Sequence, residues 1–480
     1  LGNVWTGNIN SIWGVAGNWS MYIPTSGLDG LIPTTPLGSN FPTIPSGFIA
    51  DVDNLQVQAN ATINVQPGAT LDVFGVLTNN GTINFDNNGS LLQRTGSTIA
   101  GNGTYNISRL GSGGFNYDYW SSPIINQPTV PGISYLYNSN TSTQDDADDM
   151  PSDPGWASYN GAMTQGQGYA ARELGVYTFT GTVGNGPINK SLTYYAFDNT
   201  YSQTIAGTPF NLVGNPYPSA ISASQFIADN PNIDGTIMFW DDDLSSGSGY
   251  HRSDYAYWNG TGGLGTGAGI IGAPNGFIST AQGFMVRALN SGSSISFNNN
   301  QRVPASNSQF FRMNGEDSRL WFSIERESSI NQILIGMLDD ATTSEDRLYD
   351  AVKMHTANSL SIAAIANDFE HAIMAFPPPT ESQTVPLLVT ANQAGYYLFK
   401  ANILENFAGY QVFFNDVLSN TSELIEEGTT IERFLNPGEH ANRFYLNFSL
   451  STITSLSDYQ TETLAAFVSQ GTLHLSTNQT

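Results

Sequence analysis

Two runs of aspartate are the residues in this sequence whose type and spacing could do chemistry. Calcium takes six to eight oxygen ligands, so a few carboxylates on a loop, together with backbone carbonyl groups, could bind it. Neither run matches an EF-hand loop or a nonapeptide calcium repeat, and a solvated acidic loop, the commoner role of a charge run, stays open as the alternative. The candidate calcium ligands are Asp145, Asp146, Asp148, Asp149, Asp241, Asp242, Asp243 and Asp254.

The histidines and the absent cysteines offer no catalytic arrangement. No histidine belongs to an HExxH motif, a paired metal-ligand spacing or a nucleophile-elbow pattern, and without cysteine there is no thiolate chemistry. The sequence therefore predicts a protein that is not an enzyme and requires no cofactor, with calcium as the one candidate ion. A glycosidase with two carboxylates across a cleft is the enzymatic alternative, because sequence spacing cannot show whether such a cleft exists.

Tryptophans could serve a different chemistry, since an indole ring can stack on the apolar face of a sugar. Trp156 and Trp258 are the candidate glycan-stacking residues. Trp120 and Trp240 both lie at landmarks of an internal repeat described below, where each copy requires a core residue, which favours a core role for both.

Composition restricts the partners. The chain has 480 residues, enough for three or four domains, with 40 acidic and 15 basic side chains and a formal net charge of -25. Affinity for nucleic acid comes from Lys and Arg that displace counterions, so we exclude nucleic acid as a partner. No apolar run reaches the roughly 18 residues that a membrane-spanning helix needs, and we expect no membrane span.

The first clear repeat predicts a solenoid over residues 51–110. Three similar hexads begin at Asn60, Asn80 and Asn102, and in each the alternating apolar residues face one side while Gly and Asn supply turns. Stacked coils of this kind form a β-solenoid, whose end needs a cap. We assign residues 1–50, with Trp5 and Trp19 among their aromatic residues, to that cap.

A second, fainter repeat covers residues 111–310, with copies at about 111–200 and 201–310. Its landmarks occur in the same order in both copies and begin with Tyr119-Trp-Ser-Ser-Pro-Ile in the first and Val213-Gly-Asn-Pro-Tyr-Pro in the second. The sequence predicts one short helix here, over residues 222–229, with Ser222 or Ser224 as its N-cap.

Residues 311–452 contain seven to nine alternating strands and predict a β-sandwich. Residues 453–480 read as a linker followed by one strand near the end of the chain. The fold expected from the sequence is all-β, with a short N-terminal β-solenoid, duplicated β modules and a C-terminal β-sandwich.

These landmarks together resemble a family of secreted Bacteroidetes proteins that the type IX secretion system exports. The resemblance rests on Trp5-Thr-Gly, the two motifs at Tyr119 and Val213, Gln282-Gly-Phe and Arg443-Phe-Tyr-Leu-Asn-Phe. The segment from Leu464 resembles the first strand of the C-terminal sorting domain of that system, truncated here. The resemblance implies a large extracellular protein and no transferable catalytic residues.

From these features we expect a non-catalytic adhesive or structural protein, outside the cell or on its surface, exported with a signal peptide that is removed before Leu1. It could self-associate into a filament or layer through β-strand addition, or bind other cell-surface components. A glycan-binding module and the non-catalytic part of a secreted polysaccharide hydrolase are the alternatives.

Overall fold

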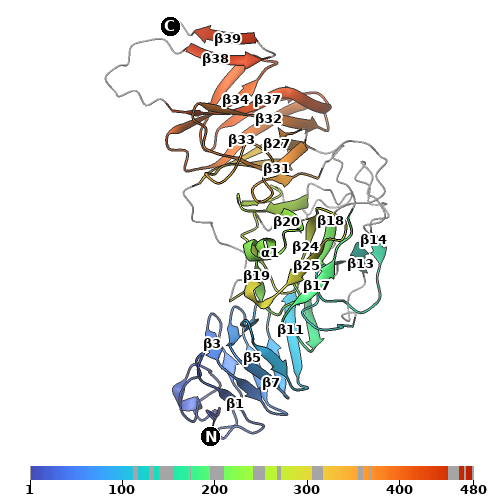
Figure 1. Ribbon diagram of the computed structural model, residues 1–480, viewed down its shortest axis with the longest axis vertical. Coiled ribbons are helices and arrows are strands. Elements are labelled where there is room, and N and C mark those ends of the chain that lie inside the picture. The colour runs from blue at the N-terminus through green and yellow to red at the C-terminus, as the bar shows by residue number, and fades with distance from the viewer. Residues whose placement is uncertain are drawn as a thin grey trace, which may run out of the picture.

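The protein is elongated and almost entirely built from β-strands, as the sequence predicted (Figure 1). The computed structural model describes residues 2–111, 117–128, 135–139, 156–172, 175–194, 210–241, 254–267, 272–304, 317–354, 360–367, 369–451, 464–469 and 472–477. Three parts follow one another along the long axis: an N-terminal solenoid, a middle module and a C-terminal sheet.

The solenoid consists of three parallel ladders, one on each side of the coil. The first contains β1 (Gly30–Ile32), β4 (Leu55–Val57), β7 (Val76–Asn79) and β10 (Thr98–Ala100). The second contains β2 (Thr43–Ile44), β5 (Thr62–Val65), β8 (Thr82–Phe85) and β11 (Thr104–Leu110), and the third β3 (Ile49–Val52), β6 (Thr70–Val73) and β9 (Ser90–Gln93).

The predicted hexads lie directly above one another, which confirms the solenoid. In the second ladder Asn64, Asn84 and Asn106 are in register. The amide nitrogen of Asn84 donates to Oδ1 of Asn64 at 2.9 Å, and that of Asn106 donates to Oδ1 of Asn84 at 2.8 Å. The apolar residues on either side of each Asn face the core, so each repeat adds one polar and two apolar rungs.

The ladders begin earlier than the hexads do, because β1, β2 and the first half of β3 lie within the segment that we assigned to the cap. Residues before Gly30, including a 3-10 turn at η1 (Ala16–Asn18), close the coil. Trp5, Trp13 and Trp19 pack together there, with ring centroids 4.9 to 6.4 Å apart. Parallel bridges from Val4 to Leu31 and from Ile12 to Thr43 cover the open ladder ends.

The middle module contains two antiparallel sheets with matching strand order. In the first, the order is β12 (Asp118–Trp120), β15 (Tyr169–Arg172), β13 (Tyr135–Ser139) and β14 (Trp156–Ser158). In the second, it is β18 (Phe210–Gly214), β24 (Gly283–Ala288), β20 (Ile233–Trp240), β21 (Tyr255–Trp258) and β22 (Gly263–Leu264). Corresponding landmarks pair in the same way in the two sheets. Trp120 is opposite Tyr169 in the first sheet, and its counterpart Val213 is opposite Phe284, the counterpart of Tyr169, in the second.

The two sheets contact each other reciprocally. Trp120 bridges to Gln282 of the second sheet, and the corresponding Val213 bridges to Gln167, which precedes the corresponding strand of the first sheet. The amide of Ser121 donates to the carbonyl oxygen of Ala281 at 2.8 Å, and the amide of Gly214 donates to that of Gly166 at 3.2 Å. The contact therefore has approximate two-fold symmetry.

The remaining elements of the module support these sheets. The helix α1 (Ala223–Asp229) starts at Ser222, whose hydroxyl accepts from the Gln225 amide, as predicted. Strand β16 (Val176–Gly181) pairs with β11 of the solenoid. The others are β17 (Ile188–Ser191) with β25 (Ser294–Phe297), β19 (Ala220–Ser222) with β23 (Phe277–Ile278) and β26 (Arg302–Val303), and the turn η3 (Asn299–Gln301).

The C-terminal part is one continuous sheet of eleven strands, so the predicted sandwich of separate sheets is not confirmed. Its order is β35-β34-β37-β32-β30-β31-β28-β27-β33-β36, with β29 beside β31. The bounds are β27 (Ser318–Arg326), β28 (Ser329–Met337), β29 (Ala351–Val352), β30 (Ser361–Ala366), β31 (Phe369–Phe376), β32 (Ser382–Ala391), β33 (Gly395–Glu405), β34 (Tyr410–Asp416), β35 (Thr421–Ile425), β36 (Thr430–Leu435) and β37 (Gly438–Leu450).

This sheet curls around a single aromatic core. Phe399 of β33 lies 4.8 Å from Phe414 of β34 and 4.9 Å from Phe444 of β37, although β33 and these two strands stand near opposite ends of the strand order. At the two edges, Arg433 of β36 donates to Asp416 of β34 at 3.1 Å and also pairs with Glu423 of β35. Side chains thus close the curl.

Two further strands follow the curled sheet. Strands β38 (Leu464–Ser469) and β39 (Thr472–Thr477) pair with each other as an antiparallel hairpin. They lie in the segment 453–480, beyond the top of the C-terminal sheet in Figure 1.

Candidate functional site

The solenoid is fastened to the middle module by a buried arginine. Arg302 donates to the carbonyl oxygen of Leu91 at 2.6 Å, to Oγ of Ser219 at 3.0 Å, and lies over the Tyr217 ring at 4.8 Å. The Leu91 amide donates to the Pro218 carbonyl oxygen at 2.7 Å in return. Burial lowers the pKa of Arg302 to about 9, and the guanidinium is held by neutral acceptors. We call this contact the solenoid joint.

The middle module is fastened to the C-terminal sheet by the connection between β28 and β29. Nε of Arg347 donates to the Ile233 carbonyl oxygen at 2.8 Å. Oγ1 of Thr261 donates to the Tyr349 carbonyl oxygen at 2.6 Å, and Trp321 donates to that of Gly263 at 3.0 Å. Apolar side chains of both parts, including buried Leu334, form one shared cluster beside these bonds. We call this contact the sheet joint.

Of the candidate calcium ligands, the structure describes Asp241 and Asp254. Both are buried, with 3% exposure, and the Asp241 amide donates to the Asp254 carbonyl oxygen at 2.8 Å. Burial, the Tyr255 hydroxyl and the charge of Asp254 raise the pKa of the neighbouring Tyr119 well above its usual value. Within the described ranges no group of three or more His, Asp or Glu could hold a metal ion. The others, Asp145, Asp146, Asp148, Asp149, Asp242 and Asp243, lie outside the described residues.

The tryptophans are mostly core residues. Trp258 is 3% exposed and lies against Gly276, so it offers no open ring face to a sugar, and its predicted stacking role is corrected to a packing role. Trp120 packs on Tyr177 at 4.7 Å, and Trp240 packs on Tyr119 at 5.8 Å, in agreement with their places in the repeat. The backbone of Trp156 lies in β14, and its side chain is outside what the structure describes.

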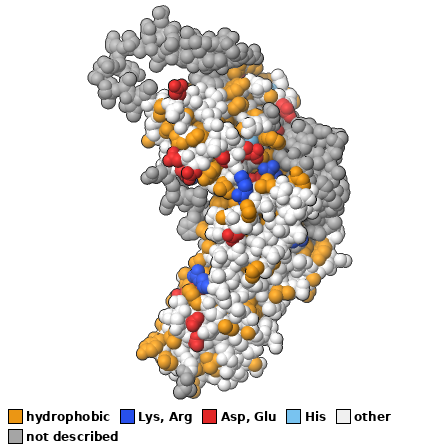
Figure 2. Space-filling view, viewed as in Figure 1, with side chains coloured by type: hydrophobic (Ala, Val, Ile, Leu, Met, Phe, Trp, Pro, Cys, Tyr) orange, Lys and Arg blue, Asp and Glu red, His pale blue; other side chains and the backbone are white. Residues whose placement is uncertain are grey.

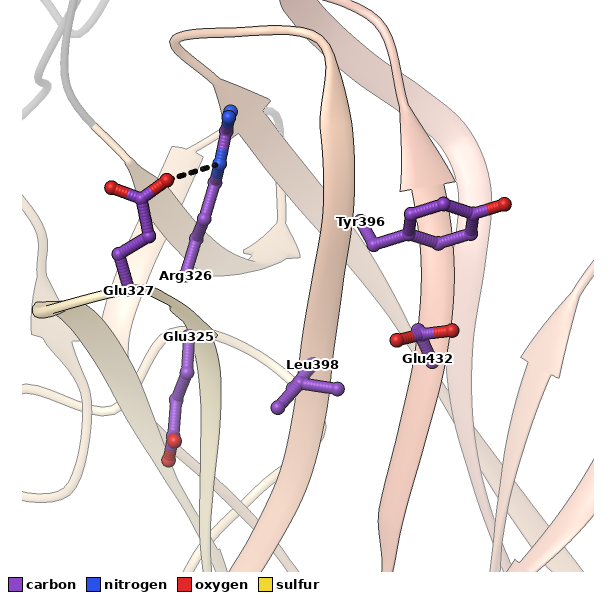
Figure 3. Close-up of a pocket in the computed structure, with 6 residues that line it drawn as sticks. All are labelled: Glu325, Arg326, Glu327, Tyr396, Leu398 and Glu432. Carbon is purple, nitrogen blue, oxygen red and sulfur yellow. Dashed lines mark ion pairs between the residues drawn. The ribbon is translucent and has the colours of Figure 1, made fainter.

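A surface pocket of about 360 Å³ lies on the C-terminal sheet, where β27, β33 and β36 run side by side (Figure 3). Arg326 and Glu327 stand on one side, Tyr396 and Glu432 on the other, and Leu398 lies between them. The register explains the arrangement, because Leu398 faces Glu325 across one strand pair and Glu432 across the other. Alternation along β33 turns Tyr397 and Phe399 inward and Tyr396 and Leu398 outward.

The aromatic wall of the pocket is exposed. Tyr396 is 63% and its cross-strand neighbour Phe434 49% accessible, and their rings meet edge to face at 5.4 Å. Singly exposed apolar side chains are ordinary on a protein surface, but two paired aromatic rings beside a hollow are a feature of ligand sites.

The charged walls are partly fixed. The guanidinium of Arg326 lies 5.2 Å from the Tyr397 ring centroid and bonds to the Tyr397 hydroxyl at 3.1 Å. A Cβ at Gly395 would come within 3.1 Å of its Cζ, so the glycine leaves room for it. Glu327 pairs with Arg326 at 3.8 Å, while its side chain stays 82% exposed. Glu325 accepts a hydrogen bond from Ser323 at 3.0 Å.

This pocket has no counterpart among the expectations from the sequence. Alternation predicts the strand around Tyr396 but assigns no binding role to its outward face. The sequence feature that could have indicated it is the run Tyr396-Tyr-Leu-Phe399, in which large apolar or aromatic residues occupy both the inward and the outward positions of the strand. A strand with one face in the core must then expose an aromatic residue on the other.

The fold defines an all-β protein built on a capped β-solenoid, with a repeated middle module and a curled C-terminal sheet. The chain belongs to a family described as a domain of unknown function, DUF8693, whose model matches residues 4–448 and so spans all three parts. No curated protein and no solved structure gives a significant match. No helix among the described residues combines the length and apolar character needed to cross a membrane.

Proposed function

We propose that this protein is a non-catalytic adhesive or structural protein that acts outside the cell or on its surface. The observation that carries the proposal is that buried contacts at both joints connect the three parts into one elongated body. An elongated body with capped or covered ladder ends holds its far surfaces away from its point of attachment, which suits a spacer or adhesin. The resemblance to secreted Bacteroidetes proteins supports the location.

The surface composition supports contact with a partner rather than with nucleic acid. In the view of Figure 2 much of the solenoid and middle module carries neither acidic nor basic side chains, and acidic side chains gather over the C-terminal sheet. Large uncharged surfaces lower the desolvation cost of association. The aspartate runs are retained within this proposal as a candidate calcium site.

Self-association would proceed by strand addition. Within the described ranges β38 and β39 pair with each other alone, and a two-stranded hairpin is marginally stable without further partners. The hairpin is therefore the element that we propose as the donated strand. The N-terminal segment packs as the cap, with Trp5, Trp13 and Trp19 buried, and is not free to be donated.

Electron microscopy of the purified protein and of secreted material tests both parts of this proposal. We expect single particles with the elongated outline of Figure 1, and longer assemblies if strands are exchanged. Deletion of residues 464–480 should shorten or abolish the assemblies. Compact particles would contradict the elongated body, and assembly unchanged in this deletion would contradict strand donation.

A further inference from the structure

We infer that the pocket formed by Glu325, Arg326, Glu327, Tyr396, Leu398 and Glu432 binds a neutral carbohydrate unit. This inference rests on the proposed function, because it names the chemical class to which an adhesive protein of this kind would attach. The pocket replaces Trp258 as the candidate stacking site, since its aromatic ring is open to solvent where that of Trp258 is buried.

The apolar wall matches the apolar face of a sugar ring. The Tyr396 ring borders the pocket, and Phe434 of the neighbouring strand packs against that ring. Leu398 forms the apolar floor of the pocket. A pyranose ring carries C–H groups on one face and hydroxyl groups around its edge, so an aromatic ring bordered by polar groups complements both. The volume of about 360 Å³ falls at the small end of ligand pockets, as suits one or two sugar units.

The polar walls offer hydrogen-bond acceptors to the sugar hydroxyl groups. The carboxylates of Glu327 and Glu432 are exposed acceptors. Arg326 is held by the inward Tyr397 and pairs with Glu327, so its part is to orient that carboxylate.

The charges disfavour acidic ligands. Three glutamates repel a sulfated or carboxylated sugar, and the ion pair between Glu327 and Arg326 reduces the charge that could attract a basic side chain. An uncharged polyol meets no charge repulsion. Of the ligands that could use the exposed ring, a neutral sugar therefore matches the apolar and polar walls best.

The test is binding of the full chain to an array of neutral, acidic and amino-sugar oligosaccharides, with oligolysine as a further probe. Isothermal titration then gives the affinity for the strongest neutral oligosaccharide. We expect binding to neutral members, and a loss of at least about tenfold in affinity in Tyr396→Ala, as expected for removal of a stacking ring. Glu432→Gln, which keeps the shape, should weaken binding less.

Tyr22→Ala is the matched control, because Tyr22 is 69% exposed and belongs to the N-terminal cap, far in sequence from the pocket. It should leave sugar affinity unchanged, and circular dichroism should show both tyrosine variants folded. Absence of neutral-sugar binding, equal affinity in Tyr396→Ala, or Tyr396-dependent binding of acidic sugars or oligolysine would overturn the inference. Particle shape is measured separately, so elongated particles that bind no sugar would refute only the pocket.

Discussion

Nη2 of Arg302 donates a hydrogen bond of 2.6 Å to the carbonyl oxygen of Leu91, which lies 211 residues earlier in the chain. A strand of the middle module is thereby fixed to the last complete coil of the solenoid. Because this one side chain bonds residues of both parts at the centre of the solenoid joint, its removal measures what the joint adds to the pairing of β11 with β16.

Arg302→Met should destabilise the solenoid joint by about 3 kcal/mol, since buried acceptors at Leu91 and Ser219 lose their donor. Differential scanning calorimetry should show the solenoid unfolding at lower temperature than in the parent. Lys400→Met is the control, because this exposed cation should change stability by only about 0.5 kcal/mol. Equal melting curves for all three proteins would show that the joint does not depend on Arg302.

Asp350 should make the sheet joint weaker as the pH rises. Burial raises the pKa of Asp350 to about 7 from an unfolded value of 3.8, against the amide hydrogen bonds that it accepts from Asp346 and Ala375. The folded state then binds more protons than the unfolded state between those pH values, so stability falls through this window by on the order of 2–4 kcal/mol.

The measurement is urea denaturation at pH values from 4 to 8. Asp350→Asn should flatten the decline, whereas Asp340→Asn, which alters an exposed carboxylate of the same connection, should retain it. A decline of the same slope in both variants would assign the effect to another group.

Asp416 should have the opposite pH dependence. Although burial opposes its ionisation, hydrogen bonds from Arg443 hold its pKa below the usual value, and Arg433 adds a second ion pair. Its stabilising contribution is present above pH 3.8 and is lost as the pH falls through the lowered pKa. Asp416→Asn should cost about 3 kcal/mol at pH 7, as for one partner removed from a buried pair, and much less at pH 2. Thermal melts at the two pH values measure the difference, and an equal cost at both would contradict this assignment.

The reciprocal contact in the middle module depends on two corresponding glycines. A Cβ at Gly168 would lie 2.5 Å from Cγ of Leu212, and one at Gly283 would lie 2.9 Å from the carbonyl carbon of Tyr119. Gly168→Ala and Gly283→Ala should each destabilise the module by about 1–3 kcal/mol through overpacking. Gly27→Ala meets nothing within 4 Å and should be nearly neutral, and a penalty of the same size there would exclude the steric explanation.

Local patterns in the sequence predicted local structure well. The Asn hexads predicted the stacked rungs at Asn64, Asn84 and Asn106, and Ser222 predicted the start of α1. Both depend on interactions between residues that are near in sequence or repeated at a fixed spacing. The landmarks of the middle module also take corresponding places in its two sheets.

Long-range pairing was beyond the sequence. Alternation shows that β33 and β36 are strands, but it does not show that Arg433 brings one sheet edge to the other. For the same reason the predicted sandwich could not be told from a single curled sheet. The exposure of single aromatic residues could not be predicted from the sequence either. Trp258 and Tyr396 are both aromatic residues in alternating strands, and only the tertiary packing buries Trp258 and leaves Tyr396 exposed.

The stacked coils have a mechanical consequence. Hydrogen bonds between successive coils run along the direction in which the solenoid grows, so a pull on its two ends would open them one rung at a time instead of shearing many at once. Each coil holds the 20 to 22 residues between hexads, and would add about 70 Å of contour length when it unwinds. A molecule that links a cell to a surface could yield under load in this way and rewind when the load is removed.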